Sequence, residues 1–183
     1  MQRLIKLIEL IEKWARDREL DKKGTVEGQL IKTAEEVAEL IIGISKDDID
    51  VIKDSIGDVF VTLVIGNLIT NVKVLPYDNK VEFKERIKYG GNLNSKTISS
   101  KYNITRSLID NLDLLMLNGS YKTGISKLWM DLNGICLMYG LTPSDCIESA
   151  YKEIADRKGV VKNGSFVKAS DLEKQEQESD LDE

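Results

Sequence analysis

Acidic residues at helical spacing are the feature of this sequence with the clearest chemical potential. Glu35, Glu36 and Glu39 fall on a predicted helix over residues 26–45, and Asp54 and Asp58 stand at the start of a strongly apolar segment. Like charges three or four residues apart on a helix repel by roughly 0.2–0.5 kcal/mol per pair, so packing does not ask for this pattern. A carboxylate at the edge of a buried helix is costly unless something compensates its charge. A bound divalent cation would do so.

The spacing of these acids allows several of them to face one ion. Glu36 and Glu39 lie one turn apart, and Asp58 joins them if a second helix over 47–70 packs antiparallel to the first, as the short connection at 45–48 favours. Oxygen ligands without histidine or cysteine select hard cations. The sequence therefore predicts a site for Mg²⁺, with Mn²⁺ as the alternative.

Two further polar residues share the same arc of the predicted helix. Lys32 and Gln29 precede Glu36 by one and two turns. A lysine beside a metal-bound phosphate would neutralise its oxygens, and a nearby carboxylate would orient or deprotonate an attacking water. The competing interpretation is an ordinary solvated face, because Glu-Glu-x-x-Glu is common on helix surfaces. The residues alone leave both interpretations open.

Apolar periodicity predicts the elements that must position these residues. A continuous run over 59–65 makes the central helix apolar almost all round, although its β-branched residues leave a strand as the alternative. Proline and glycine turn signals mark 72–103 as an irregular insertion. The predicted helices cover 3–19, 26–45, 47–70, 104–117, a segment of four turns ending near Tyr139, and a segment that begins at Thr142-Pro143 and stops before Gly159.

The carboxyl-terminal part of the chain has two distinct patterns. Asn163-Gly164 between Val160-Val161 and Phe166-Val167 predicts a short hairpin. Residues 170–183 hold seven acids and one base, a charge of −6, so the rest of the chain is at +1 within the formal total of −5. We expect an all-α helix bundle over 1–168, with a short hairpin, followed by a disordered acidic tail over 169–183.

Composition excludes several classes of function. The sequence contains no histidine, which removes Ser-His-Asp and Cys-His catalysis. Cys136 and Cys146 lack metal-site spacing and are expected to be buried small residues. The sequence lacks the basic stripe that nucleic-acid binding would require. No apolar run approaches the ~20 residues of a membrane span. Residues 1–19 do not resemble a signal peptide, so a cytoplasmic location is expected.

The motifs resemble those of a known family. Gln29-x-x-Lys32-x-x-Glu35-Glu36-x-x-Glu39, followed by Ile56-Gly57-Asp58, looks like the MazG-like nucleotide pyrophosphohydrolases, all-α enzymes whose pattern is E-x-x-E and then E-x-x-D about twenty residues on. The stretch 150–159 with Asn163-Gly164 resembles the ending of bacteriophage-type members. The likeness covers roughly residues 10–70 and 141–168.

The resemblance implies Mg²⁺-dependent cleavage of a nucleoside triphosphate between its α and β phosphates, in the cytoplasm of a host cell if the chain is phage-encoded. It also implies a homo-oligomer, a dimer or a tetramer, which the strongly apolar helices favour too. The implied roles are metal ligation by Glu36, Glu39, Asp54 and Asp58, a catalytic part for Glu35 and Glu39 near the attacking water, and substrate binding by Gln29, Lys32, Arg157 and Lys158.

One position departs from the family pattern. The second acidic pair calls for an acid at position 55, where this chain has Ser55, and Asp54 stands one residue earlier. Asp54 is then a displaced ligand, or the site has one carboxylate fewer. The alternative function is a non-catalytic helical interaction or regulatory protein that keeps the fold with a degraded metal site. Trp14 and Trp129 could stack on a base, although core packing is the favoured interpretation.

Overall fold

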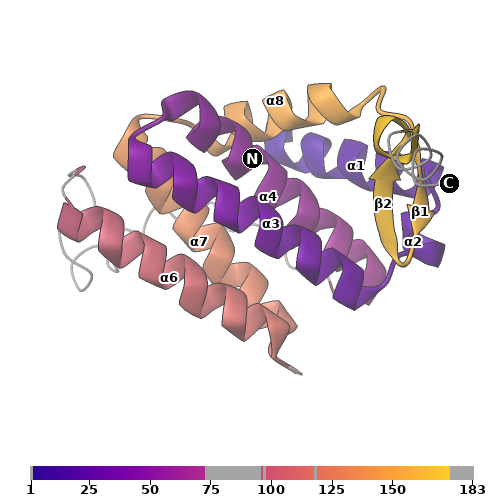
Figure 1. Ribbon diagram of the computed structural model, residues 1–183, viewed down its shortest axis with the longest axis horizontal. Helices are drawn as coiled ribbons and strands as arrows, with labels where there is room; N and C mark the ends of the chain where they lie inside the picture. Colours follow the sequence, from indigo (N-terminus) through magenta and orange to yellow (C-terminus); the bar gives the residue numbers. More distant parts are fainter. Residues whose placement is uncertain (1, 73–95, 97, 118, 174–183) are drawn as a thin grey trace, which may run out of the picture.

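The computed structural model describes residues 2–72, 96, 98–117 and 119–173 (Figure 1). The chain folds into a helical bundle with one small hairpin, and no other strand occurs in the described ranges. Its elements are α1 (Gln2–Asp17), α2 (Leu20–Lys23), α3 (Val26–Lys46), α4 (Ile49–Thr70), α6 (Ile98–Met116), α7 (Tyr121–Tyr139), α8 (Pro143–Ile154), β1 (Gly159–Lys162) and β2 (Ser165–Lys168).

Helices α3 and α4 form an antiparallel pair joined by a very short turn. Thr25 caps α3 by accepting a hydrogen bond from the backbone of Gly28 at 3.1 Å. Asp47 ends α3 in the left-handed conformation, and Asp48 caps α4 by accepting from the backbone of Val51 at 3.2 Å. These local caps fix the turn, so the acidic stretch of α3 lies against the first half of α4.

Helix α4 lies at the centre of the bundle, where α1, α3, α7 and α8 pack against it. Gly57 lets α8 approach closely, because a Cβ at this position would lie 2.5 Å from the carbonyl oxygen of Cys146 and 2.7 Å from the Cβ of Ala150. Asp58 follows directly in sequence. The close approach therefore brings the end of α8 beside the acidic positions of α4.

Helices α6 and α7 form a second antiparallel pair beside the first. Their interface carries a polar network in which Ser107 Oγ and Asn111 Nδ2 donate to the Asp131 carboxylate at 2.8 and 2.6 Å. Phe60 of α4 packs against Trp129 of α7 with ring centroids 4.9 Å apart. The two pairs thus share one core, and α6 lies on the outside of the molecule (Figure 1).

The hairpin docks onto the beginning of α3. Val160 pairs with Val167 in an antiparallel register, and Asn163 and Gly164 both have positive φ, as a tight two-residue turn requires. The backbone N–H of Thr25 donates to the carbonyl oxygen of Gly164 at 2.9 Å. A Cβ at Gly28 would lie 2.7 Å from that oxygen, so glycine allows the contact. This contact sets where β2 ends relative to α3.

The predicted all-α class and the hairpin are confirmed, and two details of the prediction are wrong. The run over 59–65 is helical as predicted, which excludes the alternative of a strand. The helix expected at 104 begins at Ile98. Residues 169–173, assigned to the disordered tail, are helical. Most of the insertion predicted over 72–103 and the tail residues 174–183 lie outside the described residues.

Candidate functional site

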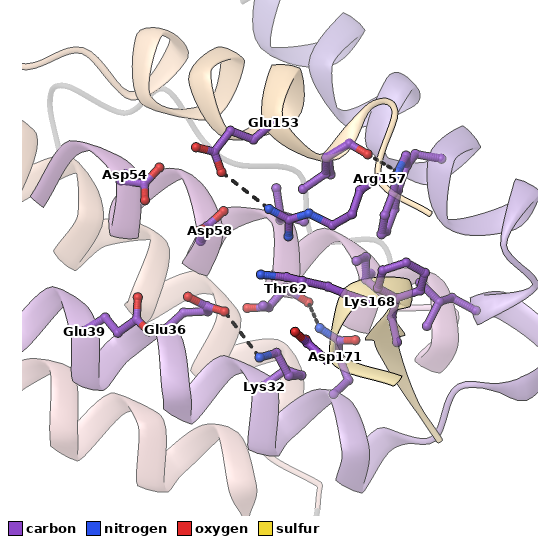
Figure 2. A pocket seen from close by; sticks show the side chains of 17 residues that line it. Lys32, Glu36, Glu39, Asp54, Asp58, Thr62, Glu153, Arg157, Lys168 and Asp171 are labelled. Carbon is purple, nitrogen blue, oxygen red and sulfur yellow. Dashed lines mark hydrogen bonds and ion pairs between the residues drawn. The ribbon is translucent and has the colours of Figure 1, made fainter. Parts of the chain in front are cut away.

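A cavity of about 350 Å³ opens between α3, α4, the end of α8 and the hairpin (Figure 2). Its wall combines acidic, basic and apolar side chains from the first four helices, from the end of α8, and from β2 and the turn after it. The residues that line it are Trp14, Leu20, Gln29, Lys32, Glu36, Glu39, Asp54, Asp58, Val61, Thr62, Ile65, Glu153, Ile154, Arg157, Phe166, Lys168 and Asp171.

Four carboxylates gather at one end of this cavity, with Glu36 and Glu39 on α3 opposite Asp54 and Asp58 on α4 (Figure 2). Burial first, and then the negative charges of Glu36, Asp54 and Glu153, raise the pKa of Asp58 to about 7 against the influence of Arg157. Burial also raises the pKa of Glu36 and of Asp54. Among the described residues, Lys32 and Arg157 therefore offset only part of the negative charge at the acidic end.

Lys32 lies beside this acidic end on α3. Its ammonium group forms an ion pair with Glu36 at 3.6 Å and a closer one with Glu35. Burial lowers the pKa of Lys32, but these two carboxylates together raise it above its ordinary value. The two glutamates differ in position, since the Glu35 side chain is 51% exposed and that of Glu36 is 15% exposed. Lys32 thus stands charged at the border between cavity and solvent.

Two more cations reach the cavity from the carboxyl-terminal part of the chain. Arg157 follows α8 and pairs with Glu153 at 3.4 Å, while Lys168 ends β2. Arg18 holds the backbone here, because its guanidinium donates to the carbonyl oxygen of Arg157 at 2.7 Å and to that of Ala155 at 3.3 Å. Together with Lys32, these residues are the three cations that line the cavity.

The far end of the cavity is mainly apolar. Trp14 donates from Nε1 to the carbonyl oxygen of Ile154 at 2.6 Å, and Phe166 packs edge-on against its ring at 5.2 Å between centroids. The Arg18 guanidinium lies 4.5 Å from the Trp14 ring centroid. Trp129 is absent from the cavity lining and belongs to the core beside Phe60. Trp14 is thus held rigidly at the cavity wall, where it is only 6% exposed.

The structure brings most of the residues predicted from the sequence into one place. Glu35 and Lys158 are the exceptions: both are exposed and neither lines the cavity. Ser55 is buried and does not line it, so Asp54 is the acid that faces the cavity one turn before Asp58. The predicted residues that do line it are Gln29, Lys32, Glu36, Glu39, Asp54, Asp58 and Arg157.

Four polar residues of the cavity were not predicted as site residues: Thr62, Glu153, Lys168 and Asp171. Thr62 was hidden in the apolar run of α4, where its carbonyl oxygen accepts from Gln29 Nε2 at 3.1 Å. Lys168 and Asp171 reach the cavity only because the hairpin docks on α3. Of these four residues, only Glu153 could have been found from the sequence, because it precedes the predicted Arg157 by one helical turn.

The donor set suits a hard cation, but its side chains do not converge. In the described part of the chain, no group of three acidic, cysteine or histidine side chains is arranged to hold a metal ion. Glu36 is engaged with Lys32 instead. The chemistry of the four carboxylates and the raised pKa of Asp58 fit Mg²⁺, whereas ligation by three of them requires side chains to change rotamer.

Comparison with known proteins adds one relative. Over 65 residues the chain is 52% identical to a protein of Haemophilus phage HP1 (strain HP1c1), described as an uncharacterized 18.2 kDa protein in the rep-hol intergenic region. The match covers 36% of this chain and 40% of the relative, so the chain spans less than half of that protein. No family model matches the chain, and no solved structure matches it. None of the described helices is long and apolar enough to cross a membrane.

Proposed function

We propose that the chain is a Mg²⁺-dependent nucleoside triphosphate pyrophosphohydrolase that produces a nucleoside monophosphate and pyrophosphate. The observation that carries this proposal is the composition of the cavity, which combines six carboxylates, four of them at the acidic end, with three cations and an apolar end. An acidic end suits a metal-bound polyphosphate, cations suit its non-bridging oxygens, and an apolar end suits a base. The motif resemblance to MazG-like enzymes agrees with this composition.

In the proposed reaction, a water oxygen bonds to the α-phosphorus, and the bond from that phosphorus to the α-β bridging oxygen breaks. Pyrophosphate leaves, and a cavity carboxylate accepts the proton of the water. Glu36, Glu39, Asp54 and Asp58 would hold the metal ion, which would supply Lewis-acid stabilisation of phosphoryl charge. Lys32, Arg157 and Lys168 bind phosphate oxygens by charge-assisted hydrogen bonds.

Glu39 is the stronger candidate for the carboxylate that accepts the proton. It lines the cavity, whereas Glu35 lies outside the lining and pairs with Lys32. The Glu35 side chain is 51% exposed at the rim and takes no part in the proton transfer. The phage origin of the relative supports a location in the cytoplasm of an infected cell.

The second candidate is a non-catalytic helical regulatory protein with a degraded metal site. The observation that favours it is the lack of convergence among the acidic side chains of the described residues. A binding protein would retain the cavity without turnover.

The test is product analysis of the full chain with a panel of ribo- and deoxyribonucleoside triphosphates and Mg²⁺. We expect equal amounts of monophosphate and pyrophosphate, loss of activity on chelation, and recovery when Mg²⁺ is restored. Asp58→Asn and Glu36→Gln should lower kcat/KM by at least about 100-fold. Glu35→Gln, one residue from Glu36 but outside the cavity lining, is the matched control. Release of diphosphate and inorganic phosphate would contradict the proposal, and no turnover with any substrate would favour the regulatory protein.

A further inference from the structure

Beyond its acidic end, the wall of the cavity carries a pair of neutral polar side chains. Gln29 lies two turns before Glu36 on α3, and Thr62 lies one turn after Asp58 on α4 (Figure 2). Both residues line the cavity although they are only 5% and 6% exposed. Because α3 and α4 are antiparallel, the pair lies between the four carboxylates and the apolar end.

The hydrogen bonds of this pair fix which of its atoms are left for a ligand. Gln29 Nε2 donates to the backbone carbonyl oxygen of Thr62 at 3.1 Å. Since a carbonyl oxygen can only accept, the amide nitrogen of Gln29 must face α4. The Thr62 hydroxyl donates its one hydrogen to the carbonyl oxygen of Val59 at 2.7 Å. Within the described residues, Gln29 Oε1 and Thr62 Oγ1 therefore remain as acceptors without a donor.

Trp14, the other neutral side chain of the cavity with a polar hydrogen, is also engaged. Its single N–H donates to the carbonyl oxygen of Ile154 at 2.6 Å. Gln29 has two side-chain hydrogens, and Thr62 and Trp14 have one each, so the bonds within the protein leave one hydrogen on Nε2 and two acceptors. A buried acceptor without a donor is costly. This wall therefore favours a ligand that brings more hydrogens than acceptors.

The surroundings of the pair indicate which part of a nucleotide it meets. Val61 and Ile65, next to Thr62 and nearly one turn after it on α4, line the cavity too. An apolar wall with a few placed polar groups suits an aromatic base, whereas the charged lining residues suit a metal ion and phosphates. With the phosphates at the charged residues, as proposed above, Gln29 and Thr62 face the base.

We propose that Gln29 and Thr62 select nucleotides whose base carries an exocyclic amino group beside an unprotonated ring nitrogen, as cytosine and adenine do. The amino group gives one hydrogen to Gln29 Oε1 and one to Thr62 Oγ1, and the ring nitrogen accepts the remaining hydrogen of Nε2. Uracil and hypoxanthine carry a carbonyl oxygen in place of the amino group and a single N–H beside it, so one acceptor stays unpaired. This inference names the substrate class of the cavity and rests on the nucleotide substrate proposed above.

The first test is calorimetric titration of the full chain with nucleoside monophosphates, which requires no turnover. We expect CMP to bind at least about tenfold more tightly than UMP, and AMP at least about tenfold more tightly than IMP, because each pair differs by an amino group in place of a carbonyl oxygen. Equal binding within the pairs, or no binding of any monophosphate, would overturn the proposal. Tighter binding of CMP than of dCMP, without a difference between CMP and UMP, would assign the acceptors to a sugar hydroxyl and would also overturn it.

The second test uses variants of the pair. Thr62→Val and Gln29→Met should each reduce the ratio of CMP to UMP affinity to within about threefold. Thr33→Val is the matched control, because Thr33 is also buried and its hydroxyl also donates to a helix carbonyl, that of Gln29 at 2.9 Å, but it does not line the cavity. This variant should keep the wild-type ratio. An unchanged ratio in both Thr62→Val and Gln29→Met would refute the role of the pair.

Triphosphate hydrolysis measured on the same preparations separates this inference from the proposed activity. Selective binding without hydrolysis would retain the inference and remove the activity. Hydrolysis with equal kcat/KM for all bases would retain the activity and remove the inference.

Discussion

Two helix interfaces of this protein provide opposite environments for a half-buried acid. Between α6 and α7, the Asp131 carboxylate accepts hydrogen bonds from Ser107 and Asn111. Between α3, α4 and α8, the Asp58 carboxylate stands among other acids, and within the described residues no donor forms a hydrogen bond with it. Buried polar groups are normally satisfied, as Asp131 is.

This difference indicates what each pair contributes. The α6–α7 interface uses its acid to hold two helices together, so the acid is part of the stability of the fold. The α3–α4–α8 cavity retains an acid whose pKa is raised to about 7 by burial and by neighbouring negative charges. An acid kept at a cost to stability is a candidate for function. Substitutions in the α6–α7 interface and in the α3–α4–α8 cavity, each measured for stability and for activity, test this contrast.

The largest expected effect on stability is pH dependence at Asp58. Its pKa is about 7 in the folded chain against an ordinary value of 3.8, so the folded state binds more protons between these values. The free energy of unfolding should therefore fall as pH rises from about 4 to about 7, by on the order of a few kcal/mol, and the loss should be complete above pH 7. Raised pKa values at Glu36 and Asp54 act in the same direction.

Urea unfolding of wild type and Asp58→Asn across this range measures the effect. The variant should show a flatter pH profile and should be the more stable protein at pH 8. Mg²⁺ should stabilise the wild type at pH 8 and have much less effect on the variant. Identical pH profiles for the two proteins would show that the Asp58 carboxylate is not under electrostatic stress.

The acidic end of the cavity could be predicted from the sequence, because its residues are placed by helical periodicity and by a short turn. The helical period of α3 places Lys32, Glu36 and Glu39 on one arc, and the short turn at Asp47-Asp48 brings α4 alongside. The same reasoning included Glu35, which lies 100° around the helix from Glu36 and points outward.

The rest of the cavity could not be predicted, because it depends on contacts between distant segments. Lys168 and Asp171 line the cavity because Gly164 accepts from the backbone of Thr25, a contact of 139 residues in sequence separation. No periodicity encodes that contact. At the position that departs from the family motif, the structure shows that Asp54 lines the cavity and that Ser55 is buried outside it.

Asp131→Ala tests the other half of the comparison. Removal of the carboxylate leaves the Ser107 and Asn111 donors without this acceptor, so we expect a loss of about 1–3 kcal/mol in the free energy of unfolding. The activity of the folded fraction should stay within about twofold of wild type. Chemical denaturation and steady-state kinetics measure both. Loss of activity without loss of stability would remove the distinction between the two regions.

Arg18→Gln tests how the cavity is held. Arg18 donates to the carbonyl oxygens of Ala155 and Arg157, so its removal should displace the Arg157 side chain from the phosphate-binding position. We expect KM for the triphosphate to rise about tenfold, or ~1.4 kcal/mol of binding, with kcat within about twofold. Arg16→Gln is the control, because the exposed Arg16 pairs only with Glu12 on its own helix among the described residues. Equal effects of the two substitutions would exclude this positioning role.

The smallest effects should come from the predicted site residues that lie outside the cavity lining. Glu35→Gln and Lys158→Ala should each change kcat/KM by less than about threefold. Their cavity-lining neighbours, in Glu39→Gln and Arg157→Ala, should lower it by more than tenfold. Steady-state kinetics on the four variants gives the comparison. If the two members of either pair behaved alike, the boundary of the functional site would have to be redrawn.

The most direct measurement of the central claim is the fate of the water oxygen. The full chain is incubated with a nucleoside triphosphate and Mg²⁺ in water enriched in heavy oxygen, and the products are analysed by mass spectrometry. Attack at the α-phosphorus predicts one heavy oxygen in the nucleoside monophosphate and none in pyrophosphate. Heavy oxygen in pyrophosphate or in inorganic phosphate, or the absence of any product, would contradict the account.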